Sequence, residues 1–230
     1  MTENQKQKFW EVIDSFEKNE LLEHLMLIGS WAELIYQDGN VLDGFKATSR
    51  TFDLDFLIKS RYKQFNPPKD IPKILKEQGF DLEHRYPDDY WKFDYYEDSI
   101  ALYVEFLVPE IGRGAVGPVE CEQYSLKATA LRHLDILSTH AITVNTNGYD
   151  IIVPAPAAYV LQKMIINEER KPDKRTKDQR AIDNILSYIH ESSELTEELK
   201  RTYESLTKKQ KKKINQYCEI HLVDLFKEME

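Results

Sequence analysis

TFDLDFLIKS (residues 51–60) has the composition of a β-strand, yet two of its side chains are acidic. Asp53 and Asp55 are two positions apart, so on a strand both side chains project from the same face. The apolar residues that alternate with them define the opposite face: Phe52, Leu54, Phe56 and Ile58. This pattern predicts a strand that packs on a layer of helices and leaves its acidic face open to a cleft.

IALYVEFLV (residues 100–108) is a second apolar strand, and its only charged residue is Glu105. If the two strands are near neighbours, Glu105 approaches Asp53 and Asp55. Three adjacent carboxylates repel one another and need a cation, for which hard divalent ions with oxygen ligands are the natural choice. Asp94 is an alternative third carboxylate, and a solvated acidic pair without any metal is the alternative to the whole site.

LIGS (residues 27–30) ends a short apolar strand at a tight turn, and a helix is expected to follow. Gly29 lets a ligand approach the backbone closely, and the N–H groups at a helix N-terminus favour phosphate. Ser30 followed three residues later by Glu33 is typical of a capping box, so an ordinary helix cap is the alternative reading of the serine.

The chain has 230 residues, of which 41% are hydrophobic and 31% charged, which predicts a globular protein of one large or two modest domains. No apolar stretch approaches the roughly 20 residues of a membrane span, and no signal peptide is evident, so a cytoplasmic protein is expected. Cys121 and Cys218 lack metal-ligand spacing and are expected to be reduced thiols. The net charge of −9 argues against a protein that coats nucleic acid nonspecifically.

Residues 163–180 form a basic segment in this acidic chain, with seven Lys or Arg against four Asp or Glu. Asp178 shares a helix face with three isoleucines, which predicts that it points inward to a partner, either Lys163 or Arg180. Lys163 and Lys177 are candidates for binding a triphosphate, and ion pairs between domains are the alternative. The lysine run at 208–213 is interpreted as a solvated helix surface rather than an RNA patch.

The hydrophobic patterns predict an α/β half followed by a mainly helical half. Two domains are expected, residues 1–118 and 119–230, with a loop at 111–118 between them. A β-hairpin is expected at 141–154, with its turn at Asn147 and Gly148. The remaining expected elements are helices at 7–20, 69–78, 124–140, 154–169, 177–190 and within 194–230, strands at 24–29, 51–58, 80–86, 90–97 and 100–108, and loops at 38–50 and 170–176.

Three segments together resemble the nucleotidyltransferase superfamily typified by DNA polymerase β: LIGS (27–30), RTFDLDFL (50–57) and VEFLVP (104–109). Downstream, IIVPAPAAYVLQKMI and KRTKDQRAID are similar to the helical half of bacterial minimal nucleotidyltransferases, a group with antibiotic adenylyltransferases and toxin-type enzymes. The resemblance implies an α+β fold, with a mixed sheet and flanking helices followed by a mainly helical C-terminal half. The 22 residues between Ser30 and Asp53 are more than the compact family version has, so the 38–50 loop is interpreted as an insertion.

The resemblance also implies a chemistry. Asp53 and Asp55 would hold two Mg²⁺ ions, and Glu105 would complete the site that activates an acceptor hydroxyl. Gly29 and Ser30 would hold the β- and γ-phosphates of an NTP.

Further residues would assist with the triphosphate: Arg50, Lys163 and Lys177. Asp178 would fix Lys163 rather than act as an auxiliary base. The acceptor, whether tRNA or another RNA, a protein or a small molecule, is left open, as is an antitoxin partner. Two alternatives remain: a non-catalytic nucleotide-binding module or toxin–antitoxin component with this fold, and a structural protein with a salt-bridged acidic pair.

Overall fold

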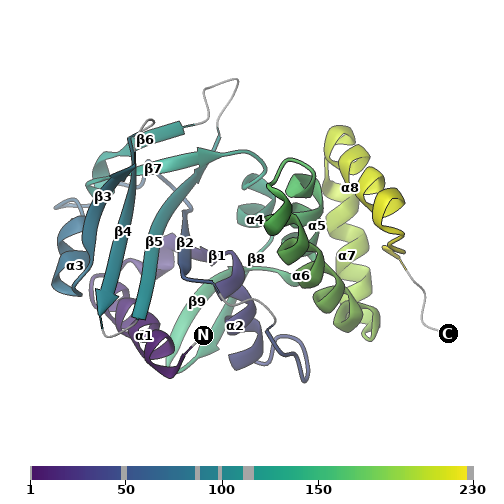
Figure 1. Cartoon of the computed structure of the whole chain (residues 1–230), viewed down its shortest axis with the longest axis horizontal. Helices are drawn as coiled ribbons and strands as arrows, with labels where there is room; N and C mark the ends of the chain where they lie inside the picture. The colour runs from purple at the N-terminus through teal and green to yellow at the C-terminus, as the bar shows by residue number, and fades with distance from the viewer. Residues whose placement is uncertain (1, 48–50, 86–88, 98–99, 111–116, 227–230) are drawn as a thin grey trace.

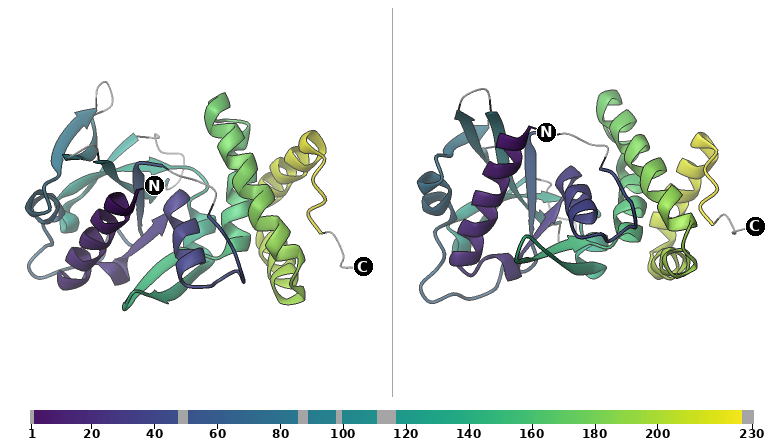
Figure 2. Two further views of the ribbon diagram at one scale, coloured as in Figure 1. Left: turned by 60° about the horizontal axis from the view of Figure 1, so that its bottom comes forward. Right: turned by 90° about the horizontal axis from the view of Figure 1, so that it is seen from below.

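The computed structural model describes residues 2–47, 51–85, 89–97, 100–110 and 117–226. A mixed β-sheet with α1 and α3 occupies one half of the molecule, and helices α4–α8 gather in the other (Figure 1). The views in Figure 2 show the same separation. The helices are α1 (Glu3–Lys18), α2 (Ser30–Asp38), α3 (Ile71–Glu77), α4 (Asp135–Thr139), α5 (Pro156–Asn167), α6 (Pro172–His190), α7 (Ser193–Ser205) and α8 (Lys208–His221). The strands are β1 (Leu25–Ile28), β2 (Asp53–Ile58), β3 (Asp81–Arg85), β4 (Tyr90–Glu97), β5 (Ile100–Pro109), β6 (Gly117–Cys121), β7 (Leu126–Leu131), β8 (Ala141–Thr146) and β9 (Tyr149–Pro154).

The main sheet has seven strands, with β1, β2, β5, β4 and β3 side by side in that order. β7 pairs with the end of β5, and β6 pairs with β7. The β2–β5 and β5–β7 pairs are parallel, whereas the other pairs of this sheet are antiparallel. The two strands expected to carry the carboxylates, β2 and β5, are therefore direct neighbours.

Helix α1 covers the apolar face of β2 and β5, as the alternation in residues 51–58 predicted. The Phe16 ring lies 5.2 Å from that of Phe56 and 6.3 Å from that of Phe106, and all three are buried. The prediction is wrong for Phe52, because β2 begins at Asp53 and the Phe52 side chain is 52% exposed. The buried apolar face of the strand consists of Leu54, Phe56 and Ile58.

The predicted β-hairpin is confirmed as β8 and β9, with positive φ angles at Asn147 and Gly148 in its turn. The hairpin packs against β1 and α2. Tyr36 of α2 donates a 2.6 Å hydrogen bond to the carbonyl oxygen of Pro154, at the end of β9. Because β9 leads directly into α5, these contacts hold the start of the helical half against the sheet.

The helix expected at residues 124–140 is wrong. Residues 126–131 form β7, and only Asp135–Thr139 are α-helical. LKATAL is rich in helix-forming residues, but its side chains are alternately buried and half-buried, and pairing with β5 and β6 overrides the local preference. Although β6 and β7 belong to the main sheet, the division into domains at residue 118 stays a prediction. Residues 111–116 of the expected boundary loop lie outside the described residues.

Helix α6 begins at Pro172, so most of the segment expected to be a basic loop before residue 177 is helical. Proline suits the first turn because its missing N–H has no partner there in any helix. The inward face predicted for this helix is confirmed: Asp178, Ile182, Ile185 and Ile189 are all buried.

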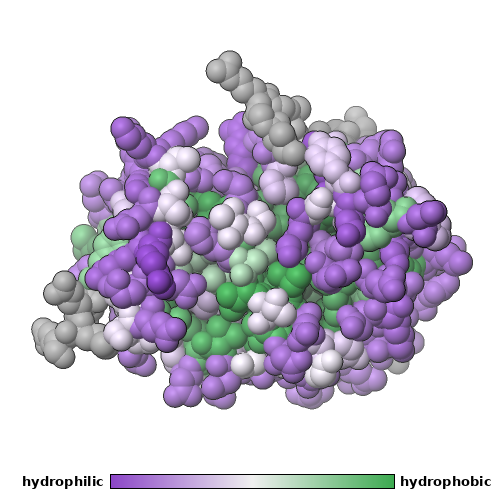
Figure 3. All heavy atoms as spheres, turned by 180° about the vertical axis from the view of Figure 1, so that it is seen from behind, coloured by the Kyte–Doolittle hydropathy of each residue, from purple (hydrophilic) through white to green (hydrophobic). Residues whose placement is uncertain are grey.

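Among the described residues, no helix combines the length and apolar character that a membrane span requires. The face of the molecule seen in Figure 3 is mostly hydrophilic, with an apolar area near its middle.

Candidate active site

The turn between β1 and α2 requires glycine. Gly29 has φ +68° and ψ −158°, which L side chains rarely adopt, and it is the N-cap of α2. A Cβ at this position would lie 2.6 Å from Oδ2 of Asp55. The absence of a side chain therefore brings the N-terminus of α2 against the acidic face of β2.

The predicted capping box at this turn is wrong. Helix α2 begins at Ser30 rather than after it, and no side chain caps the helix. The Ser30 hydroxyl forms a hydrogen bond with that of Thr51 instead. Glu33 is fully buried and accepts a 2.7 Å hydrogen bond from the hydroxyl of Tyr159 on α5. Without a side-chain cap, the end of α2 beside Gly29 keeps its affinity for an anion.

The structure brings the three predicted carboxylates together. Asp55 is the register partner of Glu105 across the parallel β2–β5 pair, and Asp53 lies two residues earlier on the same face. Asp94, the alternative third carboxylate, is buried on β4 and forms an ion pair with Arg85 of β3. Glu105 is therefore the third carboxylate of this cluster.

Lys92 lies between two of these carboxylates, and the sequence analysis missed it. Its Nζ is 2.8 Å from an oxygen of Asp53 and 2.8 Å from an oxygen of Glu105. Burial lowers the pKa of Lys92, but the hydrogen bonds with both carboxylates outweigh burial, and the pKa is raised overall. Lys92 pairs directly with Glu105 because β4 and β5 are antiparallel neighbours, with Glu97 opposite Ile100. Pairing the strands expected at 90–97 and 100–108 as an antiparallel hairpin would have indicated this contact.

Asp55 is the electrostatically costly member of the cluster. Burial, together with the charges of Glu105 and Asp53, raises its pKa from 3.8 to about 7. No hydrogen bond or ion pair joins its side chain to another side chain in the part of the chain that the structure describes. The positive charges of Arg170 and Lys174 act in the opposite direction and lower this pKa. The start of α6 thus presents positive charge to the acidic strands.

Lys163 and Asp178 form a buried ion pair between α5 and α6, with Nζ 2.6 Å from Oδ1. Of the two partners expected for Asp178, Lys163 is therefore the one found, and Arg170 lies 3.4 Å away as a second basic neighbour. Lys177 is exposed on α6, one turn after Lys174. Arg50, the other residue expected near the triphosphate, lies outside the described residues.

Asp53, Asp55 and Glu105 suit Mg²⁺ in their chemistry, because hard divalent ions prefer carboxylate oxygens. Burial first, and then the charges of Glu105 and Asp53, raise the pKa of Asp55, and a bound cation would offset this cost. In this conformation, however, no group of three or more acidic, His or Cys side chains among the described residues is arranged to hold a metal ion. The ammonium group of Lys92 lies between two of the three carboxylates. A divalent ion would therefore have to displace this ammonium group or share the carboxylates with it.

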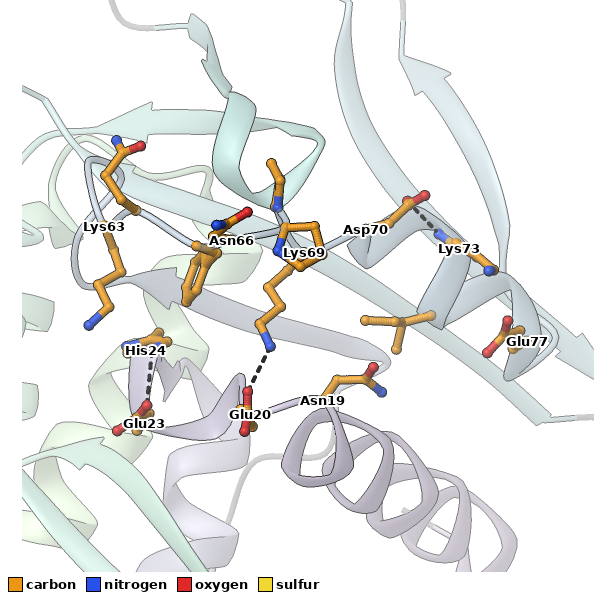
Figure 4. Close-up of a pocket in the computed structure, with 15 residues that line it drawn as sticks. Asn19, Glu20, Glu23, His24, Lys63, Asn66, Lys69, Asp70, Lys73 and Glu77 are labelled. Carbon is orange, nitrogen blue, oxygen red and sulfur yellow. Dashed lines mark hydrogen bonds and ion pairs between the residues drawn. The ribbon is translucent and has the colours of Figure 1, made fainter.

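A separate hollow of about 610 Å³ lies near His24, at the opposite end of β1 from Gly29 (Figure 4). Two pairs of its lining side chains interact: Lys69 with Glu20 at 3.0 Å, and His24 with Glu23 at 3.1 Å. None of the predicted site residues lines this hollow.

Comparison with known proteins identifies the family of this chain. A family model described as Nucleotidyltransferase matches residues 7–208. An antigenic nucleotidyltransferase-like protein from Paracoccidioides brasiliensis is 16% identical, with a TM-score of 0.46 over 86% of this chain and 87% of that chain. The antibiotic-resistance factor ANT(2'')-Ia is 13% identical, with a TM-score of 0.49 over 96% of this chain and 100% of that chain.

Among curated proteins, none matches this chain. The family model nevertheless covers most of the sequence, including the glycine turn, all three carboxylates and the α5–α6 ion pair. The chain therefore belongs to the nucleotidyltransferase family and is an enzyme of nucleotidyl transfer.

Proposed function

We propose that this enzyme moves a nucleoside monophosphate from an NTP, such as ATP, to an acceptor hydroxyl in a reaction that requires Mg²⁺. The observation that carries this proposal is the placement of Asp53, Asp55 and Glu105 on adjacent strands, beside a glycine turn that opens a helix. The acceptor oxygen forms a bond to the α-phosphorus, and the bond to pyrophosphate breaks.

Each part of the site has a role in this reaction. Asp53, Asp55 and Glu105 would hold Mg²⁺, which when bound would neutralise charge on the phosphate oxygens. A carboxylate of the same cluster accepts the proton of the acceptor hydroxyl. Gly29 and Ser30 bind the β- and γ-phosphates at the N-terminus of α2. Positive charge at the start of α6 helps to hold the triphosphate, with Lys163 fixed by Asp178.

The test is transfer of label. The protein is incubated with each α-labelled NTP, Mg²⁺, and either purified tRNA or cell extract, and labelled products are separated. Label should appear on an acceptor with Mg²⁺ and disappear in EDTA. Asp53→Asn and Asp55→Asn should each abolish transfer, whereas Asp81→Asn, at an exposed position on β3, should not. Transfer that survives in both cluster variants would contradict the assignment.

The cell-extract arm identifies the acceptor class, because labelled RNA, protein and small molecules separate by size and by nuclease or protease treatment. The same arm tests for an antitoxin partner. Adding such a partner back to the purified enzyme should suppress label transfer.

A second candidate is a module that binds nucleotides without catalysis. It is favoured by Lys92, whose ammonium group already neutralises two of the three carboxylates. Calorimetry with each Mg-NTP separates the two functions. Equal binding by the wild type and by the Asp53→Asn, Asp55→Asn double variant, without transfer of label, would support the module.

A further inference from the structure

Three aromatic side chains lie together next to the carboxylate cluster: Phe52, Tyr96 and Tyr103. The ring centroids of Phe52 and Tyr103 are 6.4 Å apart, and those of Tyr96 and Tyr103 are 5.6 Å apart, both in edge-to-face arrangements. The Tyr96 hydroxyl donates a 3.0 Å hydrogen bond to that of Tyr103. We call these three side chains the aromatic surface.

Two rings of the aromatic surface are open to solvent. Phe52 is 52% exposed and Tyr96 is 66% exposed. The large exposed hydrophobic side chains of the described residues are Phe52, Tyr62, Tyr96, Ile220 and Leu222. Two of these five therefore share one small area, and clustered exposed apolar groups, unlike scattered ones, mark binding sites.

The aromatic surface adjoins the carboxylates directly. Tyr103 is the register partner of Asp53 and lies two residues before Glu105, on the same face of β5. Lys92, which bridges those two carboxylates, has its Nζ 4.4 Å from the centre of the Tyr103 ring. A ligand on this surface would lie within reach of the reacting atoms.

The position of the aromatic surface indicates which substrate it binds. Across the sheet, Gly29 follows β1 on one side of β2, whereas Tyr103 and Tyr96 lie on β5 and β4, on the other side. In an in-line displacement, the acceptor enters opposite the leaving pyrophosphate. If Gly29 and Ser30 bind the phosphates, as the proposed function requires, the acceptor enters over β5 and β4.

We propose that the aromatic surface stacks the bases of a single-stranded nucleic acid acceptor whose hydroxyl reaches Glu105. Phe52 and Tyr96 both contact Tyr103 and are both exposed, so each can contact a separate planar group of one chain, which a nucleic acid strand provides and a single small ring does not. Stacking also suits a protein with a net charge of −9, which cannot attract a strand through its overall field.

The test compares two fluorescein-labelled RNA strands of the same length, one with a mixed sequence and one in which the central nucleotides are abasic. Binding is measured by fluorescence anisotropy in EDTA without NTP, so it does not depend on transfer. The wild type should bind the strand with bases more tightly, by about 5- to 150-fold for each stacked base. Phe52→Ala and Tyr96→Ala should each lower this preference by the factor of one stacked base, about 5- to 150-fold, and leave binding of the abasic strand unchanged. Tyr96→Phe keeps the ring and should retain the preference.

Tyr62→Ala is the matched control, because Tyr62 is 67% exposed but lies in the segment between β2 and α3. It should bind both strands like the wild type. As exposed-site variants, all four should unfold within about 2 °C of the wild type. Equal binding of both strands by the wild type, or equal losses in Tyr62→Ala and Tyr96→Ala, would overturn the proposal.

A DNA strand of the same sequence shows whether the protein prefers RNA or DNA. Binding of either strand through its bases supports the stacking. The Asp53→Asn, Asp55→Asn double variant keeps the aromatic surface and should retain the preference for bases. Stacking without label transfer in the wild type would leave this inference standing and reject the proposed function. Label transfer to a small molecule, without a preference for the strand with bases, would support the proposed function and reject this inference.

Discussion

Lys92 is the residue that most changes the interpretation of the site. Three carboxylates on adjacent strands repel one another, and a fixed ammonium group at 2.8 Å from two of them reduces that repulsion when no divalent ion is present. The protein thus carries a positive charge of its own where the proposed reaction would place a metal ion. If a divalent ion binds there, as we propose, Lys92 must release Asp53 or Glu105.

Lys92→Met should raise the affinity for Mg²⁺ about 5- to 10-fold, because the metal no longer competes with an ammonium group. Isothermal titration of the metal-free protein with Mg²⁺ measures this change. Lys127→Met is the control, since it breaks a similar 2.7 Å ion pair with Asp89 outside the cluster. Equal metal affinities in the wild type and Lys92→Met would show that Lys92 does not compete.

Asp55 gives a prediction about pH. Because its pKa is raised from 3.8 to about 7, the folded protein binds more protons than the unfolded chain in this range. Stability therefore falls as the pH rises through the window between these two values. In EDTA, Asp55→Asn should unfold like the wild type at about pH 4 and be more stable at about pH 8, by up to about 4 kcal/mol. Urea unfolding across this range tests it, and a stability difference that does not change with pH would contradict it.

At the scale of elements, the site depends on two pairings. The parallel β2–β5 pair sets the carboxylates side by side, and the α5–α6 pair fixes Lys163 on Asp178. The α5–α6 pair contains an ionic contact, Lys163 with Asp178, of which the Asp178 side chain is only 4% exposed. Removing one partner would leave a buried charge with only the more distant Arg170.

Lys163→Met should destabilise the fold by about 3 kcal/mol, because Asp178 would be left buried without its closest counter-ion. Adding Asp178→Leu in the same chain should recover most of this loss, since the charge itself is then gone. Urea unfolding of both variants measures the effect. Lys171→Met, at the exposed N-cap of α6, serves as the control and should change the stability by less than about 0.5 kcal/mol. A double variant no more stable than Lys163→Met would mean that the lysine contributes through packing instead.

At the scale of the whole molecule, the residues of the candidate site come from both halves. The sheet contributes the acidic side, and the start of α6 contributes the basic side that lowers the pKa of Asp55. The contacts that hold these halves together include the bond from the hydroxyl of Tyr159 on α5 to Glu33 on α2 and the packing of β9 on β1. A ligand that carries both phosphate and metal is expected to bind the two sides together.

Mg²⁺ with a non-hydrolysable NTP analogue should therefore raise the melting temperature. At about 100 times the dissociation constant, mass action adds about 2.7 kcal/mol, or roughly 5–10 °C for a chain of this size. Thermal melts with increasing Mg²⁺ at a fixed nucleotide concentration measure the shift. The Asp53→Asn, Asp55→Asn double variant should show little of it. An equal shift in that variant would mean that the ligand binds elsewhere.

Local patterns were sufficient for a large part of this protein. Strand parity in residues 51–58 placed both aspartates on one face, because alternation depends only on backbone geometry. The same holds for the hairpin turn at Asn147 and Gly148, and for the inward face of α6 that includes Asp178. In each case the signal lies within a few neighbouring residues.

Contacts between distant segments decided the rest. Lys92 lies between two carboxylates because three strands share a sheet in one particular register, which no single strand encodes. Residues 126–131 became a strand because the end of β5 was available for pairing, although their composition favours a helix. Phe52 was left exposed because β2 begins at Asp53, two residues later than the alternation indicated. Burial and pairing energies depend on what the folded chain brings alongside, and for these residues they exceed the local preference.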